Sequence, residues 1–326
     1  MKSSHPWTRR AFGAGLLALS CAAAAQGVYP NKPIRLMVAF APGGGGDAVA
    51  RIMAEHLGRT LGQPVIVDNK PGAGTTLAPA AVAAAAPDGY TLALAPDSVF
   101  GADKAMWPAL VKYDGASFTP VSKWARTFFV LAVNPAVGAG GFEQLLAKAR
   151  ATEGGLFVAS TQGPYPALIL EKFARQSGVK LSQVPYKGGA PAVLAVVAGE
   201  VPATFAVPSS VMPMVRDGKL QALAITAAQR SALAPDVPTL SELGLRGFDV
   251  GYWFALAGPA HLPKDVLRKL FDASARALAD PVVQAKLQQQ GYEPAPSASP
   301  EEFLQQARQD GAALQQVVEA LGIKGN

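Results

Sequence analysis

Two glycine-rich turns are the segments of this sequence whose residue types are best suited to hold a small anion. The first spans 42–47, where four consecutive glycines, Gly43 and Gly44 among them, precede Asp47. It follows an apolar, β-prone segment at 34–40 and precedes apolar residues at helical spacing. Glycine permits a tight strand-to-helix turn, and the first amides of a helix are unpaired and lie at the positive end of its dipole. The pattern therefore predicts a site for a carboxylate or a phosphate.

The second turn repeats this design and adds hydroxyl groups. It lies between a predicted strand at 64–68 and an alanine-rich segment that runs to about 86 and is predicted to be helical. It offers the backbone of Gly72, Ala73 and Gly74 together with the hydroxyl of Thr75. Two such turns in one half of the protein are suited to grip one anion from both sides.

A nucleotide-binding interpretation competes with this one. Gly43, Gly45 and Ala48 fit a relaxed dinucleotide fingerprint, and Asp68 ends the next predicted strand about 20 residues on. Asp47, however, lies in the turn, where it would repel a pyrophosphate. The phosphate-loop pattern is absent, because no Gly-Lys-Ser/Thr follows the glycines. We therefore favour a small carboxylate and expect no cofactor.

Catalytic constellations are sparse in this sequence. Beyond the first 25 residues the chain has two histidines, His56 and His261. Neither takes part in a metal-ligand spacing, and no nucleophile-elbow motif occurs. We expect no metal site and no enzymatic activity.

The first 25 residues resemble an export signal. Lys2, Arg9 and Arg10 form a positive n-region, 11–19 is a short apolar stretch, and 23–25 is a small-residue cleavage site. The mature chain is expected to begin near residue 26 and to be periplasmic. The arginine pair also fits a twin-arginine signal, and the route stays open.

Two further properties of the chain bear on its partners. Cys21, the single cysteine, lies inside the signal, so removal with the signal and lipidation are both open. Without the first 25 residues the formal charge falls from +6 to +3, which argues against nucleic acid as a partner. No long exposed heptad is evident, so we expect a monomer.

Strands and helices alternate through the middle of the chain. Further strands are predicted at 129–133, 155–159, 181–184, 204–207 and 222–225, with helices between them, and the chain is mostly helical after about 262. This alternation predicts an α/β fold with parallel sheets, in which ligands bind at the carboxyl ends of the strands.

Several longer motifs in order resemble the Bug family, the extracytoplasmic binding receptors of tripartite tricarboxylate transporters. The match runs from about residue 29 to the C-terminus and is carried by 29–35, 42–47, 68–74, 86–92, 184–189, 218–220 and 235–239. The resemblance implies a two-lobed, type II Venus-flytrap binding protein, each lobe a mostly parallel sheet flanked by helices. It implies lobe 1 at 26–127 plus 246–326, lobe 2 at 128–245, and delivery of the ligand to membrane permease subunits.

The resemblance also implies where the ligand is held. Lobe 1 would bind a carboxylate through the two glycine turns, and lobe 2 would close on the other end of the ligand. The expected ligand-binding residues are Phe40, Pro42, Gly43, Gly44, Asp47, Gly72, Ala73, Gly74, Thr75, Asp97, Ser98, Ser160, Thr161, Gln162 and Ala206.

The sequence departs from the family pattern in the region expected to select the ligand. Ala206 stands where relatives often have an aspartate, and Asp97 replaces a small polar residue. Asp97 favours a donor on the ligand, whereas Ala206 disfavours an amine, so the resemblance does not identify the ligand. An exported α/β enzyme and a receptor that feeds a sensor are the alternative functions.

Overall fold

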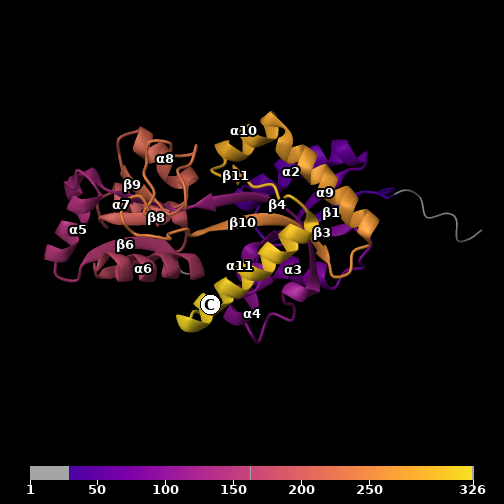
Figure 1. Ribbon diagram of the computed structural model, residues 1–326, viewed down its shortest axis with the longest axis horizontal. Coiled ribbons are helices and arrows are strands. Elements are labelled where there is room, and N and C mark those ends of the chain that lie inside the picture. The colour runs from indigo at the N-terminus through magenta and orange to yellow at the C-terminus, as the bar shows by residue number, and fades with distance from the viewer. Residues whose placement is uncertain (1–28, 162, 325–326) are drawn as a thin grey trace, which may run out of the picture.

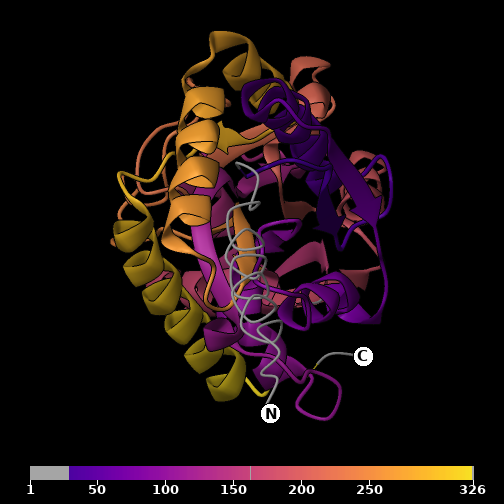
Figure 2. The ribbon, with the colours of Figure 1, turned by 90° about the vertical axis from the view of Figure 1, so that its right-hand side faces the viewer.

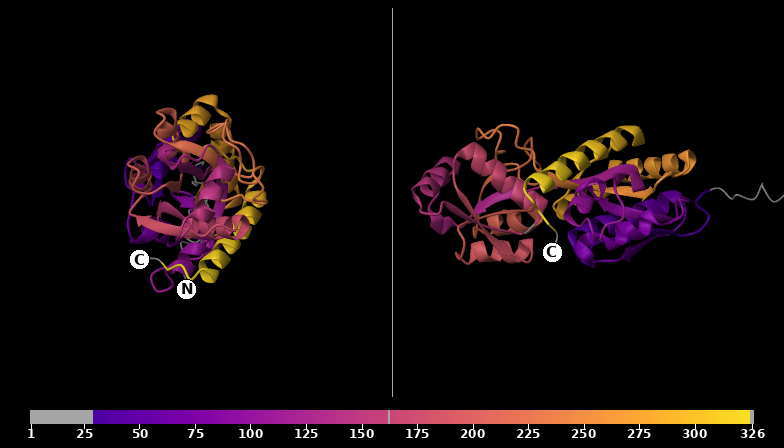
Figure 3. Two further views of the ribbon diagram at one scale, coloured as in Figure 1. Left: turned by 90° about the vertical axis from the view of Figure 1, so that its left-hand side faces the viewer. Right: turned by 90° about the horizontal axis from the view of Figure 1, so that it is seen from below.

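The computed structural model describes residues 29–161 and 163–324 and contains two sheets, each with helices on both faces (Figure 1). The predicted export signal and Gln162 lie outside the described residues. The sheet that holds the first strand forms the centre of lobe 1 and takes its strands from residues 34–128 and 251–294. The other sheet forms the centre of lobe 2 and takes its strands from residues 130–225. The two lobes are separate bodies joined at a waist in the right-hand view of Figure 3.

Lobe 1 begins as the predicted strand–turn–helix series. Strand β1 pairs in parallel with both β2 and β3, so the carboxyl ends of all three strands lie at one edge of the sheet. The elements are β1 (Ile34–Val38), α2 (Gly45–Leu61), β2 (Val65–Asn69), η2 (Ala73–Thr75), α3 (Leu77–Ala83), β3 (Thr91–Pro96), η3 (Asp97–Phe100), α4 (Ala102–Met106) and η4 (Gly115–Ser117).

Two long antiparallel strands join the lobes. Strand β4 (Phe118–Phe128) and strand β10 (Gly251–Pro259) pair along their whole length, and β10 also pairs with β3. The chain leaves lobe 1 after β4 and returns to it at the start of β10. The lobes are thus connected by two neighbouring segments of backbone.

Lobe 2 repeats the arrangement of parallel strands with an added antiparallel pair. Strand β6 is parallel to β7 and β8, whereas β5 is antiparallel to β8 and β9. The elements are β5 (Val130–Val133), η5 (Pro135–Val137), α5 (Phe142–Ala151), β6 (Leu156–Thr161), α6 (Pro164–Ser177), β7 (Leu181–Tyr186), α7 (Gly189–Val197), β8 (Ala203–Ala206), α8 (Pro208–Arg216) and β9 (Gln221–Ile225). Both sheets are therefore mixed, because β10 runs against the parallel set in lobe 1 and β5 runs against it in lobe 2.

The C-terminal segment returns to lobe 1 and is mostly helical, as the sequence predicted. It contains α9 (Lys264–Ala279), α10 (Pro281–Gln289), the short strand β11 (Glu293–Pro294) and α11 (Pro300–Ala320). Viewed along the long axis, these helices lie together on one side of the molecule, in orange and yellow (Figure 2). Every helix in the described ranges falls short of the length and apolarity needed to cross a membrane.

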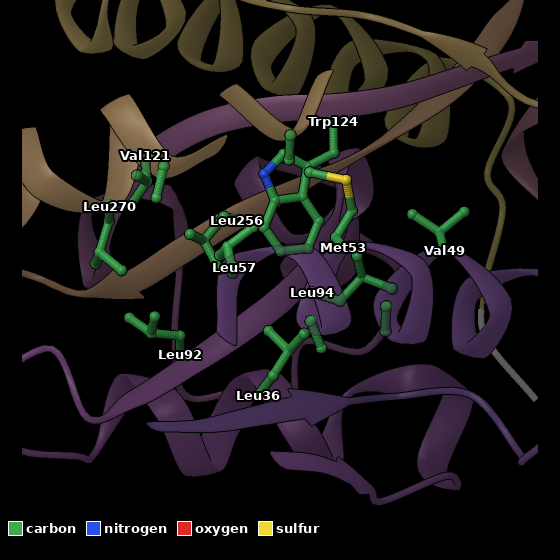
Figure 4. Packing of buried hydrophobic residues seen from close by; sticks show 14 of the residues in the cluster. Leu36, Val49, Met53, Leu57, Leu92, Leu94, Val121, Trp124, Leu256 and Leu270 are labelled. Atoms are coloured by element: carbon green, nitrogen blue, oxygen red, sulfur yellow. The ribbon is translucent and has the colours of Figure 1, made fainter. Parts of the chain in front are cut away.

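Alternation along the strands builds a core on each face of the lobe 1 sheet. In β1, Ile34, Leu36 and Val38 face α2 and α9, whereas Met37 faces the cluster that contains α3 and α11. Trp124 fills the centre of the first cluster (Figure 4), and its indole N–H donates to the Ser274 hydroxyl at 3.0 Å. Packing on both faces of the lobe 1 sheet therefore holds in place the edge at which the two glycine turns lie.

Candidate ligand-binding site between the lobes

Two adjoining cavities lie at the carboxyl ends of the parallel strands, and both are lined by Tyr165 and Tyr252. The lobe-1 cavity has a volume of about 280 Å³ and the lobe-2 cavity about 300 Å³. The lobe-1 cavity is lined by Phe40, Gly45, Gly46, Thr75, Pro96, Asp97, Ser98, Tyr165, Tyr252, Phe254 and Tyr292. The lobe-2 cavity is lined by Phe129, Ser160, Thr161, Gly163, Pro164, Tyr165, Pro166, Gly189, Ala192, Phe205, Ala206, Val207 and Tyr252.

The start of α2 forms one wall of the lobe-1 cavity. Gly44 is the N-cap, so the amides of Gly45 and Gly46 have no acceptor within the helix. A β-carbon at Gly45 would collide with the Tyr292 hydroxyl, and one at Gly46 would collide with the Phe40 ring. Glycine at these positions lets two aromatic rings pack beside free amides at the positive end of a 17-residue helix.

Asp47 holds the first glycine turn together. Its carboxylate accepts from the Gly43 amide at 2.9 Å, from Arg51 Nε at 2.9 Å and from Asn69 Nδ2 at 2.8 Å. Burial raises the pKa of this carboxyl, but the hydrogen bonds from Arg51, Gly43 and Asn69 outweigh burial and lower the pKa overall. Asp47 does not line either cavity, and its negative charge stabilises the turn through these hydrogen bonds.

The second turn is held in a strained backbone conformation. Ala73, Gly74 and Thr75 have φ angles of 46°, 63° and 73°. Positive φ is rare for β-branched residues and costs on the order of 1–3 kcal/mol, and such strain clusters at ligand-binding sites. Thr75 lines the lobe-1 cavity together with Gly45 and Gly46 at the start of α2. Gly74 also packs against the Trp107 ring, so this glycine has a structural role as well.

Asp97 is a buried carboxyl on the floor of the lobe-1 cavity, with 5% of its surface exposed. It accepts a hydrogen bond from the Trp253 amide at 3.2 Å. Burial raises its pKa to about 7, against the opposing effect of hydrogen bonds from the Tyr165 side chain and from the amides of Trp253 and Ser98. Because Tyr165 belongs to lobe 2, this interaction links the two lobes across the cavity.

Aromatic rings line both cavities: Tyr165 and Tyr252 border each of them, and Phe129 borders the lobe-2 cavity. The ring centroids of Phe129 and Tyr165 are 6.4 Å apart, those of Phe129 and Tyr252 are 6.1 Å apart, and those of Tyr165 and Tyr252 are 5.8 Å apart. On the polar side, the Ser160 hydroxyl accepts from Gln183 Nε2 at 2.8 Å. The lobe-2 cavity is thus mainly apolar.

The structure brings together about half of the residues expected from the sequence. Phe40, Thr75, Asp97 and Ser98 line the lobe-1 cavity, and Ser160, Thr161 and Ala206 line the lobe-2 cavity. Gln162 lies outside the described residues. The remaining residues do not line either cavity and instead form the turns behind it: Pro42, Gly43, Gly44, Asp47, Gly72, Ala73 and Gly74.

The aromatic residues that line the cavities, apart from Phe40, were not predicted from the sequence. Tyr165 lies between two prolines at the start of a predicted helix, which is a signal that it faces the sheet edge. Tyr252, Phe254 and Tyr292 reach the site from distant parts of the chain, and no local pattern marks them. Among the described residues, no group of three or more His, Cys, Asp or Glu side chains is arranged to hold a metal ion.

Two α/β lobes joined by paired strands, with cavities between them at the strand ends, define a two-lobed solute-binding protein of the Venus-flytrap class. Residues 49–323 match the family described as "Tripartite tricarboxylate transporter family receptor", and the chain belongs to that family.

Individual relatives agree with this assignment. The chain is 36% identical to Protein BugT of Bordetella pertussis over 233 residues, which cover 71% of this chain and 72% of BugT. It is similar to MatC of Rhodopseudomonas palustris, solved with bound malate, at 32% identity and a TM-score of 0.71, covering 89% of this chain and 100% of MatC. It is also similar to an R. palustris protein solved with adipate, at 28% identity and a TM-score of 0.77, covering 91% and 99% of the two chains.

Proposed function

We propose that this protein is an exported, periplasmic receptor that captures a small carboxylate between its lobes and delivers it to the permease subunits of a tripartite carrier. The observation that carries the proposal is the convergence of the α2 amides and the strained Thr75 turn on one cavity. Relatives solved with malate and adipate support a carboxylate as the ligand class.

The ligand carboxylate is placed at the lobe-1 end of the site. The amides of Gly45 and Gly46 supply donors there, and the hydroxyls of Ser98 and of Thr75, which donates to the Gly74 carbonyl, can rotate toward the ligand. The turn residues behind them, from Pro42 to Asp47 and from Gly72 to Gly74, hold these donors in position without lining the cavity. Lobe 2 then closes on the ligand through Ser160, Thr161 and the wall that contains Ala206.

The role is binding and transport in a monomer, without turnover. The family to which the chain belongs consists of receptors. Tyr165 and Tyr252 each line both cavities, so each can contact the part of a ligand in either cavity. This arrangement suits a protein that closes around its ligand.

Native mass spectrometry on freshly purified protein tests the proposal directly, because it weighs a co-purified ligand. Calorimetry then compares mono-, di- and tricarboxylates on wild type and on Thr75→Val combined with Ser98→Ala. Loss of two hydroxyl donors to a charged group should weaken the best carboxylate by about tenfold or more. The matched control is Thr152→Val with Ser182→Ala, two hydroxyls of lobe 2 outside both ligand cavities. Absence of binding by every carboxylate, or equal affinity in wild type and the cavity variant, would contradict the proposal.

A further inference from the structure

We infer that Asp97 takes part in capture as a neutral acid: it donates a hydrogen bond to the carboxylate of the ligand, so capture takes up one proton from solvent. The inference rests on the proposed function and assigns a role to one residue of the same site. It is carried by the position of Asp97 in the lobe-1 cavity, by the hydrogen-bonding groups around its carboxyl and by the charges on the surrounding elements.

Asp97 borders the cavity in which the ligand carboxylate is placed. It is buried and lines the lobe-1 cavity together with Gly45 and Gly46 at the start of α2. Among the described residues that line the two ligand cavities, Asp97 is the one Asp, Glu, Lys, Arg or His. A ligand anion therefore enters a cavity of about 280 Å³ that already holds a carboxyl group and whose described walls carry no basic side chain.

Two carboxylates in one small cavity are costly if both are ionised. Each negative charge disfavours the other, and burial removes the water that would screen them. Pairs of carboxyl groups that lie side by side therefore share a single proton. The ligand carboxylate faces the free amides at the start of α2, which favour its charge, so the proton belongs on Asp97.

The unliganded protein already makes this proton easy to hold. Burial raises the pKa of Asp97 to about 7, and the negative charge of Asp310 adds to the rise. Hydrogen bonds from the Tyr165 side chain and from the amides of Trp253 and Ser98 oppose it. A ligand anion beside Asp97 would raise this pKa further. Protonation therefore costs little near neutral pH and is favoured once the ligand is bound.

The contacts of the Asp97 carboxyl show what a ligand adds. The Trp253 amide donates to Oδ2 at 3.2 Å, and the Tyr165 side chain and the Ser98 amide also donate to this carboxyl. These groups suit the ionised form, which can only accept. A protonated Asp97 has an O–H that needs an acceptor, and a ligand carboxylate in the same cavity supplies one. A hydrogen bond from O–H to an ionised oxygen is short and strong.

The charged groups on the other elements around Asp97 do not favour a second negative charge. A third cavity, lined by parts of β4, β10 and α11, also borders Asp97. Its other charged lining residues are two bases and three acids: Lys123, Arg126, Asp249, Glu293 and Asp310. Arg126 is paired with Glu293 at 2.8 Å, and Lys123 donates to Gln306 at 2.9 Å. Burial raises the pKa of the tyrosines at the site, so they stay uncharged: Tyr165, Tyr252 and Tyr292.

Calorimetry in several buffers counts the proton. Malate, adipate and hexanoate serve as probes, because carboxylates of this kind ionise at about pH 4–5 and bring no proton at pH 8. Binding at pH 8 is measured in phosphate, HEPES and Tris, which differ in ionisation enthalpy. The probe that binds best should take up about 0.9 proton, because most of the unliganded Asp97 is ionised at that pH.

The sign of the proton count separates the inference from the proposed function. An ionised Asp97 that accepts from a donor on the ligand would give no uptake or a release of protons. Either result would overturn the inference and leave the proposed function intact. Absence of binding by every probe, at pH 6.5 as well as at pH 8, would reject both.

Replacement of Asp97 tests the assignment to this residue. Wild type should bind about twentyfold more weakly at pH 8.5 than at pH 6.5, because less of Asp97 carries a proton. Asp97→Asn keeps a donor that does not ionise, so its Kd should change by less than about twofold over this range and its proton uptake should vanish. Asp97→Ser, which also removes the titrating group, should lose the uptake in the same way if the Asn variant does not fold.

The matched control is Asp103→Asn, at a second buried carboxyl. Burial raises the pKa of Asp103 as well, and Asp103 lines neither ligand cavity. This variant should keep the proton uptake and the pH dependence of wild type. Loss of the uptake in Asp103→Asn, or its persistence in a folded Asp97 variant, would overturn the inference.

Discussion

At the scale of single residues, the two acids beside the site have opposite electrostatic environments. Asp47 receives three hydrogen bonds, one of them from Arg51, and its pKa is lowered. Asp97 is buried, and burial together with the nearby charge of Asp310 raises its pKa to about 7, although Tyr165 donates a hydrogen bond that opposes the rise. Asp47 therefore stabilises the turn as an anion, whereas Asp97 is an acid whose charge changes near neutral pH.

The raised pKa of Asp97 predicts a specific dependence of stability on pH. The folded protein keeps a proton on Asp97 between about pH 4 and 7 that the unfolded chain loses, so the free energy of unfolding falls as the pH rises through this window. The fall is on the order of 4 kcal/mol in total. Asp97→Asn should abolish it and should be more stable than wild type at pH 8. Urea unfolding at pH 5, 6, 7 and 8 measures this, with Asp236→Asn at an exposed position as control. Parallel curves for wild type and Asp97→Asn would show that the carboxyl is not responsible.

Which residues line the site could be predicted only in part. The turns were identified because glycine runs and strand ends are local signals, and Phe40, Thr75 and Asp97 adjoin them. The sequence does not show that Asp47 directs its carboxylate back into the turn, because that depends on Asn69, 22 residues away. The aromatic wall escaped prediction for the same reason: Phe129, Tyr165 and Tyr252 come from three parts of the chain that are far apart in sequence.

At the scale of elements, the short strands and helices were predicted well, and the two longest strands were missed. Strands β1 and β6 and helix α6 follow simple apolar patterns flanked by turn residues. Strand β4 contains Pro120, Lys123 and Arg126, which obscure any alternation, and β10 is apolar without a period. Their pairing with each other over a long sequence separation is what makes them strands, and the antiparallel direction of β10 makes the lobe 1 sheet mixed.

The two glycine turns differ in what a side chain would meet, which gives a prediction about each. Gly43 has a φ of 82° and open space around the position of a β-carbon, so Gly43→Ala should cost only the backbone strain, about 1 kcal/mol. Gly74 has a φ of 63°, and a β-carbon there would run into Trp107, so Gly74→Ala should cost clearly more. Denaturant unfolding compares the two variants. Equal losses would mean that the Trp107 ring moves aside freely.

At the scale of the whole molecule, Tyr165 is the side chain that connects the lobes across the ligand space. Its hydroxyl interacts with Asp97 of lobe 1, while its ring packs against Phe129 and Tyr252 at the junction. Tyr165→Phe removes the polar contact, worth about 1 kcal/mol, and should shift the lobes toward an open arrangement about fivefold. Small-angle scattering of the unliganded protein should show a larger radius of gyration than wild type. Tyr186→Phe, in lobe 2 away from both cavities, serves as control. Identical scattering from wild type and Tyr165→Phe would contradict the prediction.

Export of the chain is open to a direct test. The mature protein is expected to begin near residue 26, so N-terminal sequencing of periplasmic material should find that start. Replacement of Arg9 and Arg10 by lysine should block export if the route is twin-arginine and leave it intact if the route is secretory. Protein that instead begins at a lipidated Cys21 would contradict the predicted cleavage.

The C-terminal helix α11 contacts both lobes, and this contact affects the rate at which a captured molecule is released. Leu314 and Val318 of α11 are buried with Ala102 and Met106 of lobe 1, and Tyr165 at the start of α6 packs against the same cluster. Separation of the lobes must expose part of this apolar surface to water, whichever molecule occupies the site. The rate at which a captured molecule escapes is then limited by a step that belongs to the protein. Escape rates of weak and strong binders should converge toward this common limit, and Leu314→Ala should quicken them all alike.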